Sequence, residues 1–268
     1  MNPAPSVPVT YGRTADGDLA ALVDDTAYAA IPGPRGLRIA NAWRLSKPMS
    51  QWRRDDFHGA IAVVADAVGF HDHIAELVQH REELLRFERK RGDGKLSTPW
   101  GQSQSSEIYA DGVVFHSTAS HGGFKLDRAR NARMPAALRV AGGWYEEDAE
   151  WAKVATGFPD LFTAYERRHA EKTLRDYYPN CWEAIHDRFL APGESVENDR
   201  RLFGEKHRHD WVVVSAIRSR EKPGMTDCIA RLGGRRDQGH ERRFLVPSDE
   251  YVAGRFGFVI DEARHLEV

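Results

Sequence analysis

The segment His116–Leu126, with the sequence HSTASHGGFKL, contains two histidines, three hydroxyl side chains, two adjacent glycines and one lysine. An imidazole that is oriented by a carboxylate can act as a general base, and a hydroxyl beside it can act as a nucleophile. Serine and threonine are also ordinary residues of strands, and adjacent glycines are typical of a turn. From its residue types alone, the segment is either part of a reactive site or a structural hairpin.

The residues around its start predict a hairpin with a defined register. Asp111-Gly112 separates two strand-like runs, and this dipeptide strongly favours a two-residue type I′ turn. With that turn, Glu107 lies directly opposite His116, with Cβ atoms ~5 Å apart. A carboxylate so placed favours the protonated imidazole and fixes the orientation of its ring. Alternation along the strands then gives an apolar face with Ile108, Ala110, Val113, Phe115 and Ala119, and a polar face with Ser105, Glu107, Tyr109, His116 and Thr118.

A second turn should follow, with either Gly122-Gly123 or His121-Gly122 as its loop. The first choice adds Lys125 to the polar face and leaves His121 at the rim of the apolar face. Two histidines five residues apart can converge on a metal ion with a carboxylate such as Glu147, but nothing in the spacing fixes a third ligand. We therefore expect His116, Glu107 and His121 to be catalytic only if the protein is an enzyme, and we expect no metal or cofactor.

Two charged segments are candidates for binding surfaces. Residues 144–148, WYEED, form either an acidic binding surface or the aromatic-anchored start of a helix, where carboxylates favour the positive end of the dipole. Residues 200–243 carry twice as many basic as acidic side chains. They either bind nucleic acid or an acidic protein surface, or keep sheet edges from pairing with other chains. The candidate binding residues are Lys125, Tyr145, Glu146, Glu147, Asp148, Arg231, Arg235, Arg236, Arg242 and Arg243.

Composition and charge narrow the function further. The 268 residues carry a net charge of −2, far from the charge that imitation of a nucleic-acid duplex requires. Cys181 and Cys228 form no CxxC pair, which excludes a cysteine-based zinc site, and both are expected to be reduced. No apolar run approaches the ~20 residues of a membrane span, and the N-terminus lacks the basic start and apolar run of a secretory signal. We expect a cytoplasmic protein without membrane association.

Before the hairpin, residues 1–96 are expected to be a mostly helical region. LRIANAWRL, residues 37–45, is typical of a short strand. The apolar segment from Asp56 to Phe70 predicts one helix, and Asp72 is a candidate N-cap for a second helix that Gly92 ends.

After the hairpin, the central region of residues 97–190 continues with helices that begin after Gly142-Gly143, at Pro159 and at Pro179. Residues 191–209 are expected to form a polar linker. Residues 210–268 contain four strand-like runs, DWVVVSAIRS, TDCIARLGG, RRFLVP and GFVID. The predicted fold is therefore α+β, with a helical N-terminal part, a central β-hairpin packed on helices and a C-terminal antiparallel sheet.

Several motifs together resemble a known but uncharacterised domain of proteobacterial proteins. They are TPWGQSQ (98–104), GVVFHSTASHGGFKLDRARN (112–131), GGWYEEDAEW (142–151), FPDLFTAYERRHAEKTLRDYYP (158–179) and the tail elements FLVP, EY, FGFVID and ARH. The resemblance covers residues 97–190 well and 210–265 more loosely, and it leaves the first part of the chain unassigned. It brings no established activity with it.

The resemblance implies a genetic context. The family is often encoded on plasmids, integrative elements and prophages, and many accessory proteins of such elements counter host restriction or CRISPR-type immunity. We therefore expect a non-enzymatic binding protein that acts on a bacterial host protein or nucleoprotein complex. The alternatives are a small hydrolase or nuclease centred on His116, Glu107 and His121, and a DNA-binding regulator that uses the basic residues 200–243, although no helix-turn-helix pattern is evident.

Overall fold

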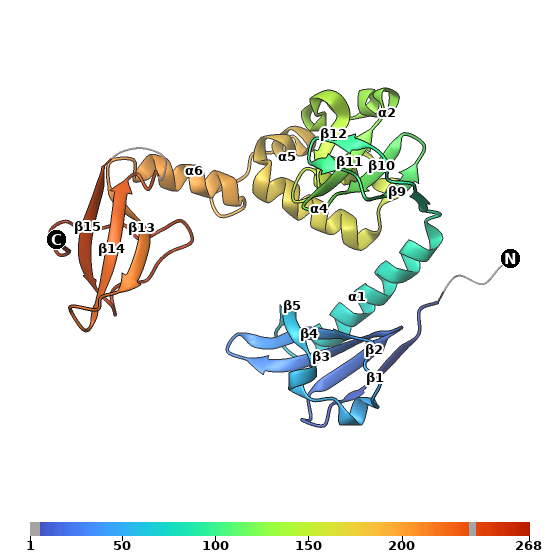
Figure 1. Cartoon of the computed structure of the whole chain (residues 1–268), viewed down its shortest axis with the longest axis horizontal. Coiled ribbons are helices and arrows are strands. Elements are labelled where there is room, and N and C mark those ends of the chain that lie inside the picture. Colours follow the sequence, from blue (N-terminus) through green and yellow to red (C-terminus); the bar gives the residue numbers. More distant parts are fainter. Residues whose placement is uncertain (1–5, 236–239) are drawn as a thin grey trace. The chain divides into compact units, whose positions relative to one another are not determined.

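The computed structural model describes residues 6–235 and 240–268 and divides into two compact units, Met1–Lys172 and Thr173–Val268. Antiparallel sheets and helices occur in both units, which confirms the α+β class (Figure 1). Within the described ranges, no helix has both the length and the apolar character needed to cross a membrane.

The first unit begins with a five-stranded antiparallel sheet whose strands follow one another in chain order. This corrects the expectation of a mostly helical region over residues 1–96, although the strand expected at residues 37–45 is confirmed as β4. The central strand β3 is buried at six consecutive positions, because both faces of the sheet are covered, so its sequence shows no alternation. The strands are β1 (Val9–Arg13), β2 (Leu19–Val23), β3 (Thr26–Gly33), β4 (Gly36–Trp43) and β5 (His58–Val64).

The helix expected from Asp56 to Phe70 is wrong, because the first half of that segment is the strand β5. Its β-branched residues pair with β4, and the side chain of Asp66 then accepts a hydrogen bond of 3.0 Å from the backbone N–H of Gly69. This N-cap starts α1 (Ala67–Arg86), a single helix in which Asp72 is an interior residue rather than a cap.

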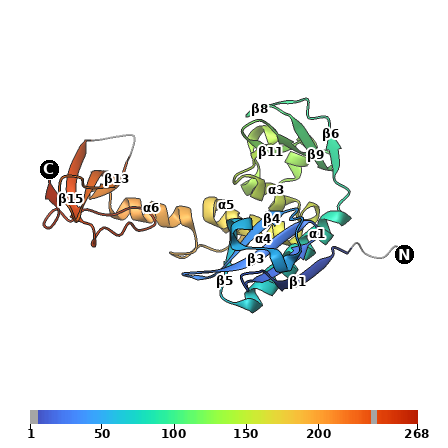
Figure 2. The ribbon, with the colours of Figure 1, turned by 60° about the horizontal axis from the view of Figure 1, so that its bottom comes forward.

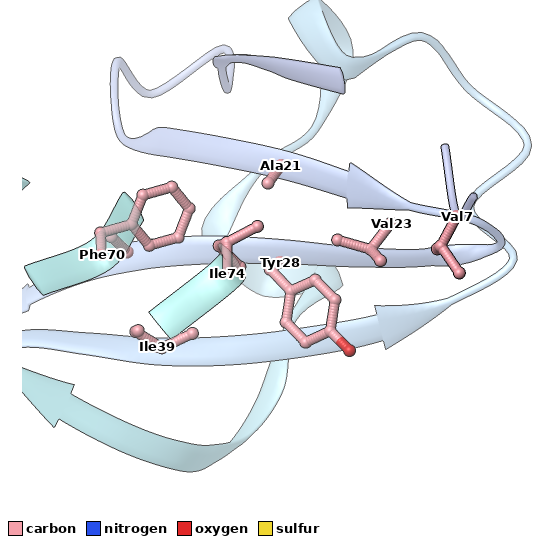
Figure 3. Close-up of a cluster of buried hydrophobic side chains, with 8 residues drawn as sticks. Val7, Ala21, Val23, Tyr28, Ile39, Phe70 and Ile74 are labelled. Carbon is pink, nitrogen blue, oxygen red and sulfur yellow. The ribbon is translucent and has the colours of Figure 1, made fainter. Parts of the chain in front are cut away.

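Helix α1 covers one face of the sheet. Phe70 and Ile74 are fully buried against Ala21, Val23 and Ile39 (Figure 3). The opposite face is closed by Trp52 and Phe57, from the segment with the short 3-10 helices η1 (Met49–Gln51) and η2 (Arg54–Asp56).

The rest of the first unit is built on a second five-stranded antiparallel sheet, with the order β12-β11-β10-β9-β6. Its strands β11, β9 and β6 are labelled in Figure 2. Helix α3 packs against β11 and β12. The strands are β6 (Lys90–Gly92), β9 (Ser105–Ala110), β10 (Val113–Ser117), β11 (Gly122–Leu126) and β12 (Trp144–Glu146), beside a separate pair of β7 (Ser97–Thr98) and β8 (Gly101–Gln102). The helices are α2 (Arg128–Arg133), η3 (Ala136–Leu138), η4 (Ala141–Gly143), α3 (Trp151–Gly157), η5 (Pro159–Leu161) and α4 (Ala164–Tyr177), which crosses the division between the units.

The second unit contains a four-stranded antiparallel sheet. Three of the four expected strands are confirmed, whereas the fourth run contributes only two isolated bridges, Val259 with Val212 and Gly257 with Gly254. The expected linker 191–209 contains a helix, because Ser195 caps it by accepting from the N–H of Asn198. The elements are α5 (Pro179–His186), α6 (Val196–Lys206), β13 (Trp211–Arg218), β14 (Met225–Leu232), β15 (Glu241–Pro247) and β16 (Leu266–Glu267).

Replacing Phe70 tests the packing of α1 on the N-terminal sheet. We expect Phe70→Ala to lower the free energy of unfolding by about 3–5 kcal/mol, because it leaves a cavity in a fully buried cluster. Val68→Ala, on the exposed side of the same helix, should change it by less than about 0.5 kcal/mol. Denaturant unfolding followed by circular dichroism measures both, and equal effects of the two variants would contradict this packing.

Candidate functional site

The hairpin that carries the predicted site contains a β-bulge. The turn at Asp111-Gly112 is confirmed, since Ala110 pairs with Val113. The next pair skips Tyr109, so that Glu107 lies opposite Phe115 instead of His116. The predicted pairing of Glu107 with His116 is therefore wrong: the extra residue shifts the register by one and sends the two side chains to opposite faces of the sheet.

The second turn also differs from both expected registers. Ser117 pairs with Gly122, which leaves Thr118–His121 as the loop and places both glycines inside β11. The hydroxyl of Thr118 donates to the carbonyl of His121 at 2.7 Å and accepts from its N–H at 3.1 Å. These bonds fix the loop without a Gly-Gly turn.

The two glycines are needed because large side chains lie directly on them. A Cβ atom on Gly123 would clash with the ring of Trp100 and with the backbone carbonyl of Tyr145, and one on Gly122 would clash with the carboxylate of Glu147. Glycine in a strand often marks such a close approach. The Trp100 ring of the TPWG motif thus covers one face of the sheet, and Glu147 lies on the other face.

On the face with Glu107, the structure forms a pocket of about 330 Å³. This volume is at the lower end of the range for ligand sites, which is ~300–1,000 Å³. Its walls combine aromatic rings with carboxylates. The lining residues are Glu107, Tyr109, Phe115, Phe124, Glu147, Trp151, Phe162 and Glu166.

One pocket carboxylate is neutralised by a buried arginine. The guanidinium of Arg89 lies 3.0 Å from Glu166 and 3.8 Å from the centre of the Tyr109 ring, and its side chain is only 9% exposed. Burial raises the pKa of the Tyr109 phenol, which therefore stays protonated. Within residues 6–235 and 240–268, neither Glu107 nor Glu147 forms an ion pair with a lysine or arginine, and the basic residue opposite Glu107 in the ladder between β6 and β9 is Arg91.

His116 lies on the opposite face of the sheet and is buried there. Its Nδ1 is 3.2 Å from the hydroxyl of Ser103, which itself donates to the carbonyl of Ser105. The Ser103 oxygen therefore accepts a hydrogen bond from the imidazole N–H and is not activated as a nucleophile. Burial lowers the pKa of His116, so the neutral ring is the stable form. His116 and Ser103 form a structural pair, and the predicted base–carboxylate pair does not exist.

The hypothesis of an acidic binding surface required an exposed Tyr145, but this residue does not lie on the surface. It is fully buried in β12, where its hydroxyl donates to Asn131 at 2.6 Å and accepts from the N–H of Val140. The expected helix start at Trp144 is also wrong, since α3 begins at Trp151. Of the neighbouring carboxylates, Asp148 is exposed, whereas Glu146 and Glu147 are partly buried beside His121, whose Nδ1 lies 3.7 Å from Glu146 and 3.9 Å from Glu147.

The other predicted binding residues are largely occupied within the protein. Lys125 donates to the carbonyl of Gly142 at 2.5 Å and lies 4.8 Å from the ring of Trp144. In the second unit, Arg231 pairs with Glu241, Arg242 with Glu262 and Glu267, and Arg243 with Asp227. Arg235 is exposed, and Arg236 lies outside the described residues. Because these arginines form ion pairs within the second unit, they favour the interpretation of the basic residues as surface charges of the C-terminal sheet over that of a binding surface.

Residues 93–208 match the family model of a domain of unknown function, DUF7007. The match agrees with the resemblance to an uncharacterised domain family, while the looser resemblance at residues 210–265 lies outside it. All residues that line the pocket fall within the matched segment. No match was found among curated proteins or among solved structures.

Gly123→Ala tests the seal between Trp100 and β11. We expect it to lower the free energy of unfolding by about 1–3 kcal/mol, because the new methyl meets both a ring and a backbone carbonyl that cannot rotate away. Gly204→Ala is the matched control: it adds a methyl in α6 with no heavy atom within 4 Å and should raise stability by up to ~1 kcal/mol. A Gly123→Ala protein as stable as the wild type would show that Trp100 does not lie on this glycine.

His116→Asn tests the burial of a neutral imidazole, since the amide can still donate to Ser103. Because the pKa of His116 is lowered in the folded protein, the unfolded state binds more protons as the pH falls below ~6.5, and folding stability is lost there. One such histidine contributes a slope of at most ~1.4 kcal/mol per pH unit. Unfolding at pH 7.5 and pH 5.5 should show a smaller loss for the variant, and an identical loss in both proteins would contradict the burial.

Proposed function

We propose that this protein is a non-enzymatic binding protein whose acidic aromatic pocket takes an arginine side chain from a protein partner. The observation that carries the proposal is the pocket itself, in which aromatic rings surround Glu107 and Glu147, two carboxylates that form no ion pair with a described lysine or arginine. A cation with a flat apolar surface is the ligand that satisfies both features.

Arginine fits this pocket better than lysine. The guanidinium is planar, stacks on aromatic faces and binds carboxylates through two parallel N–H bonds, whereas an ammonium group is a compact and strongly hydrated charge. Arg89 already shows this mode of binding inside the protein, because it lies over the ring of Tyr109 and pairs with Glu166. A second guanidinium could enter beside it and pair with Glu107 or Glu147.

The pocket suits one anchoring side chain of a larger partner. Its volume of about 330 Å³ holds a side chain rather than a folded segment. Buried arginines and aromatic residues are also the groups that most often dominate the binding energy of protein interfaces. The pocket would therefore act as the centre of a wider contact surface.

The resemblance to proteins of plasmids, integrative elements and prophages supports the choice of partner. We propose an accessory protein of a mobile genetic element that acts in the cytoplasm against a restriction or CRISPR-type system. Proteins that handle nucleic acid expose arginines to contact phosphates. Capture of such an arginine would block that surface without any imitation of a duplex, which the net charge of −2 does not favour.

The charge and shape of the ligand can be tested directly. We expect N-acetyl-arginine amide to bind the full chain, and N-acetyl-citrulline amide, which has the same shape without the charge, to bind at least tenfold more weakly. Glu107→Gln combined with Glu147→Gln should weaken arginine binding at least tenfold, because it removes both of these charges. Glu205→Gln, at an exposed glutamate of α6, should leave it unchanged. Chemical-shift titration measures the affinity of the wild type for each of the two ligands and the affinity of the two variants for N-acetyl-arginine amide. Equal binding of arginine and citrulline would exclude the proposal.

Capture from bacterial lysate tests the partner class. We expect the wild type and Glu205→Gln to retain the same host protein with and without nuclease treatment, and the double glutamine variant to lose it. Loss of the captured protein after nuclease treatment would point to a nucleoprotein complex, and retention by the double variant would show that the pocket is not the contact.

A further inference from the structure

The side chains of His121, Glu146 and Asp148 form a cluster at an end of the central sheet, and none of them lines the pocket. The loop Thr118–His121 and the segment after β12 lie side by side, because Gly123 pairs with Glu146 in the ladder between β11 and β12. His121, Glu146 and Asp148 each place a ligand atom there, and these atoms all lie within 4.8 Å of one another. Among the residues that the structure describes, only this group of three histidine and carboxylate side chains has its ligand atoms so close together.

Glu146 has one oxygen that the protein leaves unsatisfied. Its Oε2 accepts from the backbone N–H groups of Asp148 at 2.7 Å and Ala149 at 3.3 Å, which fixes the carboxylate. Its Oε1 is fully buried and has no hydrogen-bond partner in the part of the chain that the structure describes. The imidazole of His121 is 3.7 Å away, too far for a hydrogen bond. A buried charged oxygen without a partner is costly, so something else should occupy this position.

His121 is held in a defined place as well. Its backbone N–H and carbonyl both bond to Thr118, whose hydroxyl is 2.7 Å from that carbonyl. Its side chain is half exposed, which leaves one side of the cluster open to an entering ion. Thus a hydrogen-bonded loop and a hydrogen-bonded carboxylate present their ligand atoms to the same point.

The geometry points to a binding site for a divalent transition-metal ion, of the Zn²⁺ class, with His121, Glu146 and Asp148 as ligands. Two ligand atoms about 2.1 Å from a tetrahedral zinc ion lie about 3.4 Å apart, so the 3.7 Å between His121 and Glu146 is close to this spacing. Separations of up to 4.8 Å within the cluster require a side chain to move closer by about 1.4 Å. An imidazole nitrogen with carboxylate oxygens suits Zn²⁺ better than Mg²⁺ or Ca²⁺, which prefer oxygen ligands alone. Three protein ligands leave at least one coordination position for water. None of these three ligands lines the pocket, so the proposal of a metal site can be tested separately from arginine binding.

Titration of the chelator-treated full chain with Zn²⁺ in a calorimeter tests the site. We expect one ion per chain, and at least tenfold weaker binding after His121→Ala or Glu146→Gln, because each removes a ligand. Mg²⁺ and Ca²⁺ should bind at least 100-fold more weakly than Zn²⁺. Binding of Ca²⁺ as strong as that of Zn²⁺, or binding that His121→Ala leaves intact, would overturn the proposal.

Two control variants test whether the ion binds at this cluster rather than at another histidine or carboxylate. His209→Ala removes an exposed histidine beside His207 and Asp210 in the second unit, and Glu205→Gln removes an exposed carboxylate of α6. Both should keep Zn²⁺ affinity within about threefold of the wild type. Loss of binding in His209→Ala would place the ion elsewhere. His121→Asn provides a second ligand variant, and circular dichroism of each protein confirms that it folds.

Discussion

The shape of the pocket depends on one buried guanidinium, that of Arg89. It joins residues far apart in the chain, because it donates to the carbonyl of Leu161, pairs with Glu166 and lies over the ring of Tyr109. Glu166 also forms a capping box with Thr163, so the start of α4 is fixed to the same group. A buried charge without its partner is strongly destabilising. The position of the pocket walls and the first turn of α4 are therefore set by a single ion pair.

Local signals in the sequence predicted much of the fold but missed the N-terminal sheet. Turn chemistry placed the Asp111-Gly112 turn, and alternation placed β13, β14 and β15. The strands β2 and β3 are rich in alanine and buried on both faces, so they lack the alternation that identifies a strand. The helix predicted over Asp56–Phe70 included β5, because only the N-cap Asp66 marks the start of α1. The apolar residues on both sides of Asp66 gave no sign of this boundary.

The candidate site could be predicted only in part, because its geometry depends on contacts that no local pattern reveals. Glu107 and Glu147 were both named from the sequence, but the bulge at Tyr109 decides which face Glu107 occupies. That bulge brings Tyr109 against Arg89 and Phe124, which are distant in the sequence. The glycines of β11 suggested a turn, and only the approach of Trp100 explains them as strand residues. Sequence spacing gave no signal for Trp151 or Glu166 as pocket residues, or for Arg89 as the ion-pair partner of Glu166.

The position of Glu147 between the pocket and His121 has a consequence for the binding of ligands at both places. Its carboxylate lines the pocket and also lies 3.9 Å from the imidazole of His121. A cation held on one side of this carboxylate reduces the negative potential felt on the other side, and the reduction is the same in both directions. If both proposed ligands bind, occupancy of the pocket and occupancy of the His121 cluster would therefore be antagonistic, because each ligand would raise the dissociation constant of the other by the same factor. Through this linkage the concentration of free metal ion would set how tightly the protein holds a cationic partner.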